Sequence, residues 1–255
     1  MKMKIKLSVT TGIIFLLFIN IGMAQQQAEI DKANKAYMAG FYENAITIYE
    51  NILKEQVASP ELYYNLGNAY FKTNDLPSAI LNYERALKYN PGGEDILFNL
   101  SVANSKIVDK IDVLPELFYI RWWKGIKLWF SPDGWSIVLV ALFSVLFVLA
   151  ALFLLSRSAT SRKIIFAGGL FLFMAFVLSG IIAWQTWNES RQHNTAIVFA
   201  PTLAVKSSPD DSSIDLFVIH EGLKVKILDE IGDWNEIRIS NGSKGWVKSE
   251  TLKPV

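Results

Sequence analysis

The sequence predicts a multidomain membrane protein with three parts: an all-α helical array, a hairpin of two transmembrane helices and a small all-β barrel. Two observations carry this prediction. Apolar residues make up 51% of the 255 residues, and they concentrate in two long uncharged segments. Residues before these segments follow a helical pattern, and residues after them alternate with a period of two. The length alone fits one or two soluble domains, so the apolar segments decide the class.

The chain begins with a pattern typical of a secretory signal, which we assign to residues 1–24. Three early lysines precede the apolar run GIIFLLFI, and the small residues Gly22 and Ala24 stand where a signal peptidase reads the chain. An uncleaved anchor helix is the alternative. Because a basic front end keeps the amino terminus inside in both cases, the residues that follow are expected outside the cytoplasm.

Two apolar segments, residues 135–155 and 164–184, are predicted to be transmembrane helices. Neither contains a charged residue, and at about 1.5 Å per helical residue each is long enough to cross a hydrocarbon core of ~30 Å. The loop between them, residues 156–163, is basic, and short basic loops stay on the cytoplasmic side. The topology determinants are Arg157, Arg162 and Lys163.

Residues 115–134, ahead of the first span, are predicted to lie along the membrane surface. In ELFYIRWWKGIKLWF the basic residues recur at every third position and share one helical face, with apolar and aromatic residues around the rest. Ser131, Pro132 and Asp133 have the residue types of a helix start, so the first transmembrane helix should begin there. Tryptophans cluster at the outer ends of both spans, which is typical of interfacial anchoring. An aromatic ligand site is the alternative.

The segment before the spans contains an internal repeat. In LYYNLGNAYFK and the residues after it, small and aromatic residues follow the spacing of the tetratricopeptide repeat, with tyrosine in place of the usual tryptophan and phenylalanine. The matching positions are Tyr63, Leu66, Gly67, Tyr70, Ala79, Tyr83, Ala86 and Pro91. NKAYMAGFYENAITIYENILK resembles a weaker first repeat, and EDILFNLSVANSKI resembles the first helix of a third unit.

These units place a tetratricopeptide repeat domain at residues 25–114, with repeats at about 26–59 and 60–93 and a capping helix at 94–110. A single helix pair cannot bury its apolar face, and about three units are needed for a stable array. The shortage predicts that another chain, or the interfacial segment of this chain, completes the array.

Tetratricopeptide units bind proteins and are not catalytic, and the resemblance places the ligand-facing positions on the first helix of each pair. The peptide-binding groove is therefore expected at Asn34, Tyr37, Met38, Tyr64, Asn65, Asn68, Phe71 and Lys72. Asn34 and Asn68 lie one repeat apart, and amide side chains are able to hold a peptide backbone through paired hydrogen bonds. A solvated helix surface is the alternative.

After the second span, a linker at residues 185–194 leads to a predicted barrel at residues 195–255. Apolar and polar residues alternate, and turns between short strands are expected at Gly222, Gly232 and Asn241–Gly242. The order of LAVKSSPD, HEGLKVKILDE, DWNEIRI and NGSKGWVKSETL resembles a bacterial SH3-like domain.

Domains of this kind often bind cell-wall peptides with aromatic residues between their loops. The resemblance makes Trp234 and Trp246 the candidate residues for a cell-wall ligand. Closing the core of the barrel is the alternative role for both. Where the family usually has asparagine, valine and arginine, this chain has Ala204, Val205 and Lys206, so the roles of the replaced side chains do not carry over.

Composition and motifs argue against catalysis and against nucleic acid. The absence of cysteine excludes thiolate metal sites and cysteine nucleophiles. His193 and His220 have no neighbours at metal-ligand spacing, and no phosphate-binding glycine loop or nucleophile elbow is present. We interpret His220 as a surface strand residue. The soluble ends are mildly acidic, which disfavours nucleic acid, and we expect no enzyme, cofactor or metal.

The order of signal, repeats, aromatic interfacial helix, hairpin and barrel is similar to that of the E-type proteins of the bacterial aerotolerance (Bat) operon. The most specific stretch is YYNLGNAYFKTNDLPSAILNYERALKYNPGGEDILFNL. The resemblance implies a two-pass adaptor in the cytoplasmic (inner) membrane, with both soluble domains on the periplasmic side. It further implies work with von Willebrand A-domain membrane proteins and a MoxR-type ATPase in stress or oxygen tolerance. A scaffold that recruits other proteins is the first functional hypothesis, and a peptidoglycan-binding module is the alternative.

Overall fold

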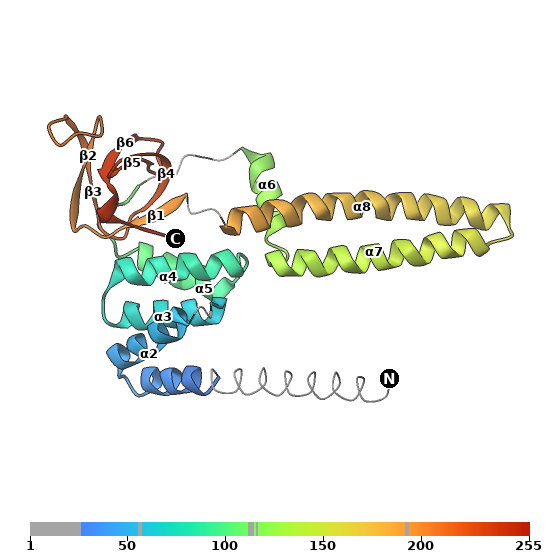
Figure 1. The fold of residues 1–255 in the computed structure, drawn as a ribbon, viewed down its shortest axis with the longest axis horizontal. Coiled ribbons are helices and arrows are strands. Elements are labelled where there is room, and N and C mark those ends of the chain that lie inside the picture. The colour runs from blue at the N-terminus through green and yellow to red at the C-terminus, as the bar shows by residue number, and fades with distance from the viewer. Residues whose placement is uncertain (1–26, 56–57, 112–114, 116, 192–193) are drawn as a thin grey trace, which may run out of the picture.

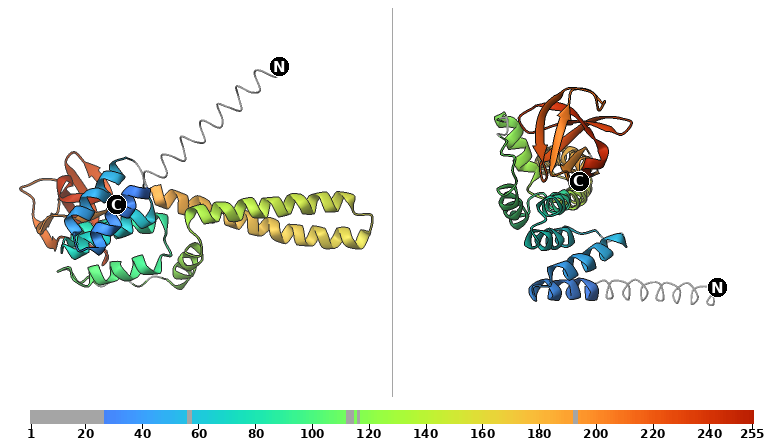
Figure 2. Two further views of the ribbon diagram at one scale, coloured as in Figure 1. Left: turned by 90° about the horizontal axis from the view of Figure 1, so that it is seen from below. Right: turned by 90° about the vertical axis from the view of Figure 1, so that its left-hand side faces the viewer.

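The structure is a computed structural model with three visible parts. A helical array and a β domain lie side by side at one end of a long two-helix hairpin (Figure 1), and the two further views in Figure 2 show the same arrangement. The predicted signal at residues 1–24 lies outside the described residues. The residues described are 27–55, 58–111, 115, 117–191 and 194–255.

The helical array consists of two helix pairs and one further helix. Residues 27–38 and α2 (Tyr42–Lys54) form the first pair, and α3 (Pro60–Lys72) and α4 (Leu76–Tyr89) form the second. The last helix, α5 (Glu94–Asn104), packs on α4 and stands where the sequence placed the first helix of a third unit.

The helices of the second pair begin where the sequence supplies caps. Ser59 Oγ accepts a hydrogen bond from the Leu62 amide at 3.1 Å, and Asp75 Oδ1 accepts one from the Ser78 amide at 3.0 Å. Each bond satisfies an amide that the first helical turn leaves without a partner. Both helices also carry a proline in their first turn, where its missing N–H has no cost.

Equivalent turns join the helices within each pair. Gly40 has a φ of 82° and Asn74 has a φ of 64°, a left-handed conformation that glycine and asparagine adopt more readily than other residues. The two positions are separated by one repeat length, about 34 residues. The backbone therefore repeats with the period that the sequence predicted.

Gly67 allows α3 and α4 to pack closely. A Cβ atom at this position would lie 2.7 Å from Cε1 of Tyr83 and 3.3 Å from the carbonyl oxygen of Ala79. The Tyr83 side chain is 1% exposed, so its ring cannot move aside without disturbing the core. The glycine of the repeat motif is thus required by helix packing.

The hairpin consists of α7 (Pro132–Leu155) and α8 (Ala159–Arg191). Both helices are long and apolar enough to cross a membrane, and their most apolar windows are 0% and 6% buried, whereas a core helix of a soluble domain would be buried. They are therefore candidate membrane spans. Ser131 Oγ accepts from the Gly134 amide at 3.1 Å, which confirms the predicted start of α7. α8 extends beyond both ends of the predicted span 164–184.

α6 (Phe118–Lys127) belongs to the predicted interfacial segment and packs on the ends of α7 and α8 nearest the folded domains. Trp123 Nε1 donates to a glutamine of α8 at 2.9 Å, and Trp135 Nε1 donates to the backbone of α6 at 3.1 Å. These tryptophans bond segments of the protein to one another. Trp122 and Trp129, in contrast, are 67% and 71% exposed.

The β domain is one antiparallel sheet with the strand order β3-β2-β6-β5-β4-β1-β7. The strands are β1 (Thr195–Val198), β2 (Thr202–Lys206), β3 (Asp215–His220), β4 (Lys224–Ile231), β5 (Trp234–Arg238), β6 (Lys244–Lys248) and β7 (Leu252–Pro254), with η1 (Ser249–Thr251) before β7. The predicted turns are confirmed, because Gly222, Gly232 and Gly242 have φ values of 85°, 59° and 93°. The predicted barrel is an open sheet with β3 and β7 at its edges.

The array and the β domain share one hydrophobic core. Ile80 on α4, Ile107 after α5, Ile197 on β1 and Val255 after β7 are at most 8% exposed and belong to one buried cluster. Gly222 closes on the same cluster, because a Cβ atom there would lie 2.6 Å from Cγ2 of Ile107. The β domain thus buries the face of α4 that the short array would otherwise leave in water.

The sequence contains too few repeat units for a stable array, and this shared core supplies the missing buried surface. We expected a second chain or the interfacial segment to complete it, and the structure gives the larger part of this role to the β domain. The segment after α6 meets the array at Gly92, where a Cβ atom would lie 2.8 Å from the carbonyl oxygen of Leu128. Burial of apolar surface stabilises by roughly 25 cal/mol per Å², so the array and the β domain stabilise each other.

The packing at Gly67 predicts a large effect of a single methyl group. Gly67→Ala should lower the free energy of unfolding by about 1–3 kcal/mol, because the methyl group overlaps the Tyr83 ring. Gly125→Ala is the matched control, since nothing lies within 4 Å of a Cβ atom at that helical position, and it should be neutral or stabilising by up to about 1 kcal/mol. Denaturant unfolding of the full chain in detergent measures both, and similar effects of the two variants would contradict the packing argument.

Candidate functional site

The eight residues predicted to face a ligand lie together on the array, where they line two adjoining hollows. The first, of about 320 Å³, is lined by Asn34, Tyr37, Met38, Tyr49, Asn65 and Asn68. The second, of about 290 Å³, is lined by Tyr37, Tyr64, Asn68, Phe71, Lys72, Tyr83, Asn99 and Val102. Tyr37 and Asn68 border both, and we call the two hollows together the array groove. That the groove binds a peptide stays a prediction.

A fixed hydrogen-bond arrangement lies in the first hollow. Asn34 Oδ1 accepts from the Tyr49 hydroxyl at 2.6 Å and from Asn65 Nδ2 at 3.2 Å. The tyrosine comes from the second helix of the pair, and the asparagine comes from the next repeat. The amide of Asn34 is therefore held in one orientation by two neighbouring helices.

The same arrangement recurs in the second hollow. Asn68 Oδ1 accepts from the Tyr83 hydroxyl and from Asn99 Nδ2, both at 2.8 Å. The donors follow their acceptor by 15 and 31 residues in both hollows. Asn99 Nδ2 also lies 3.0 Å from the Tyr64 hydroxyl. The tyrosine that replaces the usual phenylalanine at position 83 thus supplies the hydroxyl that orients Asn68.

Burial keeps these tyrosine hydroxyls protonated. It raises the pKa of Tyr49 to about 12 and also raises the pKa of Tyr83 above its ordinary value, because a phenolate is poorly solvated away from water. Both hydroxyls therefore remain hydrogen-bond donors at physiological pH. The arrangement of asparagines and tyrosines does not change with pH in that range.

The expected paired hydrogen bonds from Asn34 and Asn68 need a correction. Their Oδ1 atoms are already occupied by protein donors, so neither amide is able to accept from a peptide without breaking these bonds. Within the described ranges, their Nδ2 groups make no hydrogen bond, and the Oδ1 atoms of Asn65 and Asn99 accept none. Donors and acceptors for a ligand therefore come from different residues, at positions that the repeat fixes.

The remaining walls of the groove are aromatic and weakly basic. Lys106 Nζ lies 4.4 Å from the centroid of the Phe71 ring, Lys72 lines the second hollow, and Met38 is 77% exposed at the first. Among the described residues that line the hollows, none carries a carboxylate. This chemistry suits a peptide segment whose backbone meets the asparagines and whose apolar side chain meets Phe71.

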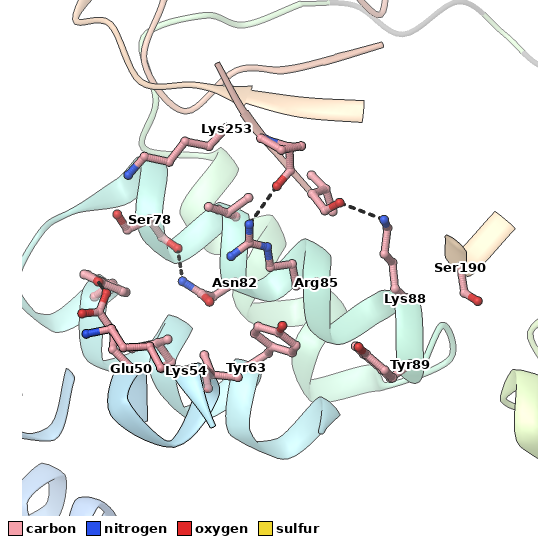
Figure 3. Close-up of a pocket in the computed structure, with 16 residues that line it drawn as sticks. Glu50, Lys54, Tyr63, Ser78, Asn82, Arg85, Lys88, Tyr89, Ser190 and Lys253 are labelled. Atoms are coloured by element: carbon pink, nitrogen blue, oxygen red, sulfur yellow. Dashed lines mark hydrogen bonds between the residues drawn. The ribbon is translucent and has the colours of Figure 1, made fainter. Parts of the chain in front are cut away.

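Cationic side chains of α4 reach the edge strand of the β domain. Arg85 Nη2 donates to the carbonyl oxygen of Pro254 and Lys88 Nζ to that of Val255, each at 2.8 Å, and Figure 3 shows both bonds. An unpaired strand edge invites association with other strands. Here two side chains of α4 bond to backbone carbonyls at the end of edge strand β7.

A hollow of about 600 Å³ lies beside these bonds, between α2, α4 and β7 (Figure 3). Asn82 lies in its wall and is 4% exposed. Its Nδ2 donates to the carbonyl oxygen of Ser78 at 2.8 Å, whereas its Oδ1 has no hydrogen-bond partner among the described residues. Tyr63 and Tyr89 stack at the lower wall, with ring centroids 5.9 Å apart.

His220 is the last residue of strand β3 and its side chain is 30% exposed, but it also contacts Asp109, which follows α5, a partner that the sequence did not suggest. Oδ2 of Asp109 accepts from the His220 backbone amide at 2.6 Å, and Oδ1 lies 2.9 Å from the ring Nδ1. Lys224 and Glu84 form a second link between the array and the β domain at 2.6 Å. Partners 111 and 140 residues apart leave no spacing signal in the sequence.

His193 lies outside the described residues, within which no group of three or more His, Cys, Asp or Glu side chains is arranged to hold a metal.

Trp234 and Trp246 lie on the face of the sheet that points away from its core. Trp246 pairs with Glu236, two residues from Trp234, so the two indoles are diagonal neighbours on one face. Ile237 and Val247, from the opposite face, are fully buried. The alternative that both tryptophans close the core is therefore wrong, and their rings are partly exposed beside Lys248, whose Nζ lies 5.6 Å from the Trp234 ring.

The topology determinants Arg157, Arg162 and Lys163 lie at the end of the hairpin that is remote from both folded domains (Figure 1). All three are exposed, apart from a hydrogen bond of 2.8 Å from Arg162 Nε to the carbonyl oxygen of Ser156. A basic loop at one end and two folded domains at the other is the arrangement that the predicted topology requires.

Comparison with known families supports two of the three parts. Residues 60–92 match the family model of the tetratricopeptide repeat, and residues 201–253 match that of the bacterial SH3 domain. No curated protein matches the chain. Together with the two apolar helices, these matches confirm the predicted fold class. A tetratricopeptide repeat suggests interaction with proteins, and a bacterial SH3 domain suggests cell-wall binding.

We expect the hydrogen bond between Asp109 and the His220 amide to stabilise the fold more than an exposed ion pair does. Asp109→Ala should lower the free energy of unfolding by about 1–3 kcal/mol, because the His220 amide loses its acceptor. Asp211→Ala removes an ion pair to Lys248 whose carboxylate is 73% exposed, and it should cost less than about 1 kcal/mol. Denaturant unfolding of the full chain in detergent compares the two. Equal losses would show that the contact between the domains is no stronger than an ordinary surface pair.

Proposed function

We propose that this chain is a non-catalytic, membrane-anchored scaffold whose array groove holds a peptide segment of another protein. The observation that carries this proposal is the repeated arrangement of asparagines and tyrosines, which fixes donors and acceptors beside partly exposed aromatic side chains and the exposed Met38. Such a surface binds a peptide backbone with little loss of side-chain entropy, because its amides are already ordered.

The placement of the parts supports a scaffold at the periplasmic face of the bacterial cytoplasmic membrane. The array and the β domain lie at one end of the hairpin, and the basic loop lies at the other (Figure 1). Because short basic loops stay in the cytoplasm, the groove would meet exported or membrane proteins. A peptide partner would then bind within a short distance of the membrane surface.

The order of the parts also supports a partner class. It is similar to that of E-type Bat proteins, which implies von Willebrand A-domain membrane proteins as partners in a complex for stress or oxygen tolerance. A membrane protein fits the site, because the array lies with the β domain at one end of the hairpin (Figure 1). A partner anchored in the same bilayer reaches the groove at a high effective concentration.

The groove hypothesis is tested by cross-linking in intact membranes, followed by purification of the full chain and mapping of the adducts by mass spectrometry. The double variant Asn68→Ala/Phe71→Ala should reduce the recovered adduct about tenfold or more, as expected for central contact residues. The matched control is Asn51→Ala/Phe41→Ala, which changes the same residue types outside the hollows and should leave the yield unchanged. An adduct that forms equally in both double variants would exclude the groove as the binding site.

Cell-wall binding through the SH3-like domain is the second candidate function. It is favoured by the position of Trp234 and Trp246 on the outer face of the sheet. The full chain in detergent should then sediment with peptidoglycan sacculi, and Trp234→Ala/Trp246→Ala should abolish sedimentation. Trp122→Ala on α6, where the indole is 67% exposed, is the control that should sediment normally. Failure of the unaltered chain to sediment would exclude this function.

A further inference from the structure

The last helix of the array, α5, adds a third row of side chains to the ligand-facing surface. Asn99 and Val102 of this helix line the second hollow beside Asn68 and Lys72 of α3. Asn99 Nδ2 donates to Asn68 Oδ1 at 2.8 Å, so α5 is bonded to the ligand-facing side of α3. Phe98 stands four residues before Val102 and therefore shares its helical face. The surface thus extends beyond the eight residues that the sequence predicted.

This row repeats the spacing of α3 with different side chains. Three of its residues stand one repeat length, about 34 residues, beyond ligand-facing residues of α3. The pairs are Tyr64 and Phe98, Asn68 and Val102, and Lys72 and Lys106. Phe98 is 67% exposed, whereas Ile96 and Leu100 of the same helix are buried in the shared core. Because Val102 lacks the amide of Asn68, the α5 end of the surface is apolar.

Two lysines stand beside this apolar surface. Lys72 lines the second hollow, and Lys106 Nζ lies 4.4 Å from the centroid of the Phe71 ring. Within the described ranges of the chain, neither lysine forms an ion pair. Lys110, rather than Lys106, donates to the carbonyl oxygen of Ser105 at the end of α5, at 2.7 Å. The charge of Lys106 is therefore not used to cap that helix.

No carboxylate offsets the two lysines at the second hollow, since none of the described residues that line it is acidic. The acidic residues of α3 and α5 stand in the first turns of these helices, at Glu61, Glu94 and Asp95. Because Glu61 and Lys72 stand at opposite ends of α3, about 16 Å separates their positions along the helix. The second hollow is therefore basic, although residues 25–114 contain more acidic than basic side chains.

This surface suits an acidic side chain that neighbours an apolar one. A carboxylate is attracted to both ammonium groups, and charge-assisted hydrogen bonds are stronger than neutral ones. An apolar side chain packed on Phe71, Phe98 and Val102 would remove their exposed surface from water. A small soluble anion would use only the lysines, whereas a peptide segment also uses the apolar row and the ordered amides of the groove.

We propose that the α5 end of the array groove recognises a segment of another protein in which an acidic side chain neighbours an apolar one. This proposal rests on the proposed function, because it names the kind of segment that the groove holds. The carboxylate lies near Lys72 and Lys106, and the apolar side chain packs against Phe98 and Val102. A basic side chain in the same place would be repelled by both lysines, which adds specificity.

The test measures the binding of defined peptides to the full chain in neutral detergent by fluorescence anisotropy. Each labelled nine-residue peptide has blocked ends and a central phenylalanine in a neutral background, with glutamate placed at each other position in turn. At least one glutamate peptide should bind about fivefold more tightly than its glutamine counterpart, the size expected for exposed charge pairs. Replacing the phenylalanine of that peptide with alanine should weaken binding about tenfold.

Variants of the two lysines assign the charge preference. Lys72→Gln/Lys106→Gln should remove the preference for glutamate and leave the affinity for the glutamine peptide unchanged, a pattern that loss of folding does not produce. Lys35→Gln/Lys54→Gln makes the same change of charge at exposed positions outside the hollows and should keep the preference. A loss of the preference in this control would show that overall charge decides binding, which would overturn the proposal.

Phe98→Ala tests the apolar part of the surface. It should weaken binding of the phenylalanine peptide about fivefold or more and leave binding of the alanine peptide unchanged. Phe41→Ala is the matched control, because its ring is 65% exposed and lies outside the hollows, and it should have no effect. Unchanged binding of the phenylalanine peptide by Phe98→Ala would overturn the proposal.

The outcomes separate this proposal from the proposed function. Peptides that bind without preference for glutamate or phenylalanine would overturn the recognition proposed here and leave the groove as a peptide site. Absence of binding by every peptide would also overturn it, and the proposed function would fall as well if the adduct in membranes were independent of Asn68 and Phe71. Full competition by free glutamate would assign the lysines to a small anion and overturn the proposal.

Discussion

The burial of α4 between two domains is the interaction on which the rest of the structure depends. One side of this helix packs on α3, where Gly67 lets the Tyr83 ring approach, and the other side places Ile80 in a core with Ile197 and Val255. A short array leaves one side of such a helix in water, and the β domain buries that side. Arg85 and Lys88 of the same helix also bond to backbone carbonyls at the end of β7. Each domain therefore supplies what the other lacks for stability.

The sequence predicted those parts of the fold that depend on local pattern. The repeat turns at Gly40 and Asn74, the start of α7 at Ser131 and the turn at Gly222 follow from residue type and spacing. The contact between the domains does not, because Asp109 meets His220 only after the hairpin brings the chain back. A usable signal existed in the adjacent apolar pair Ile80 and Leu81 on α4, since a helix with one solvated face would not carry both.

The candidate groove was likewise predicted only in part from the sequence. A family resemblance placed Asn34 and Asn68 on the ligand-facing side, but it gave no indication that their oxygens accept from Tyr49 and Tyr83. These hydroxyls come from the second helix of each pair, which the resemblance treats as core. The face of Trp234 was similarly undecided from the sequence, because alternation defines two faces without saying which one is buried. The register between β5 and β6, together with the burial of Ile237 and Val247, shows that Trp234 lies on the outer face of the sheet. The array groove and the aromatic face of the sheet then lie on two domains that share one core.

The central claim is that the array and the β domain are one cooperative unit, and hydrogen exchange of the full chain in detergent with increasing denaturant tests it most directly. Amides of α4 and of β1 should exchange through a single opening reaction, with the same free energy and the same dependence on denaturant, because neither element keeps its core without the other. Loss of protection in α4 at a lower denaturant concentration, while β1 stays protected, would contradict the account and show two independent domains.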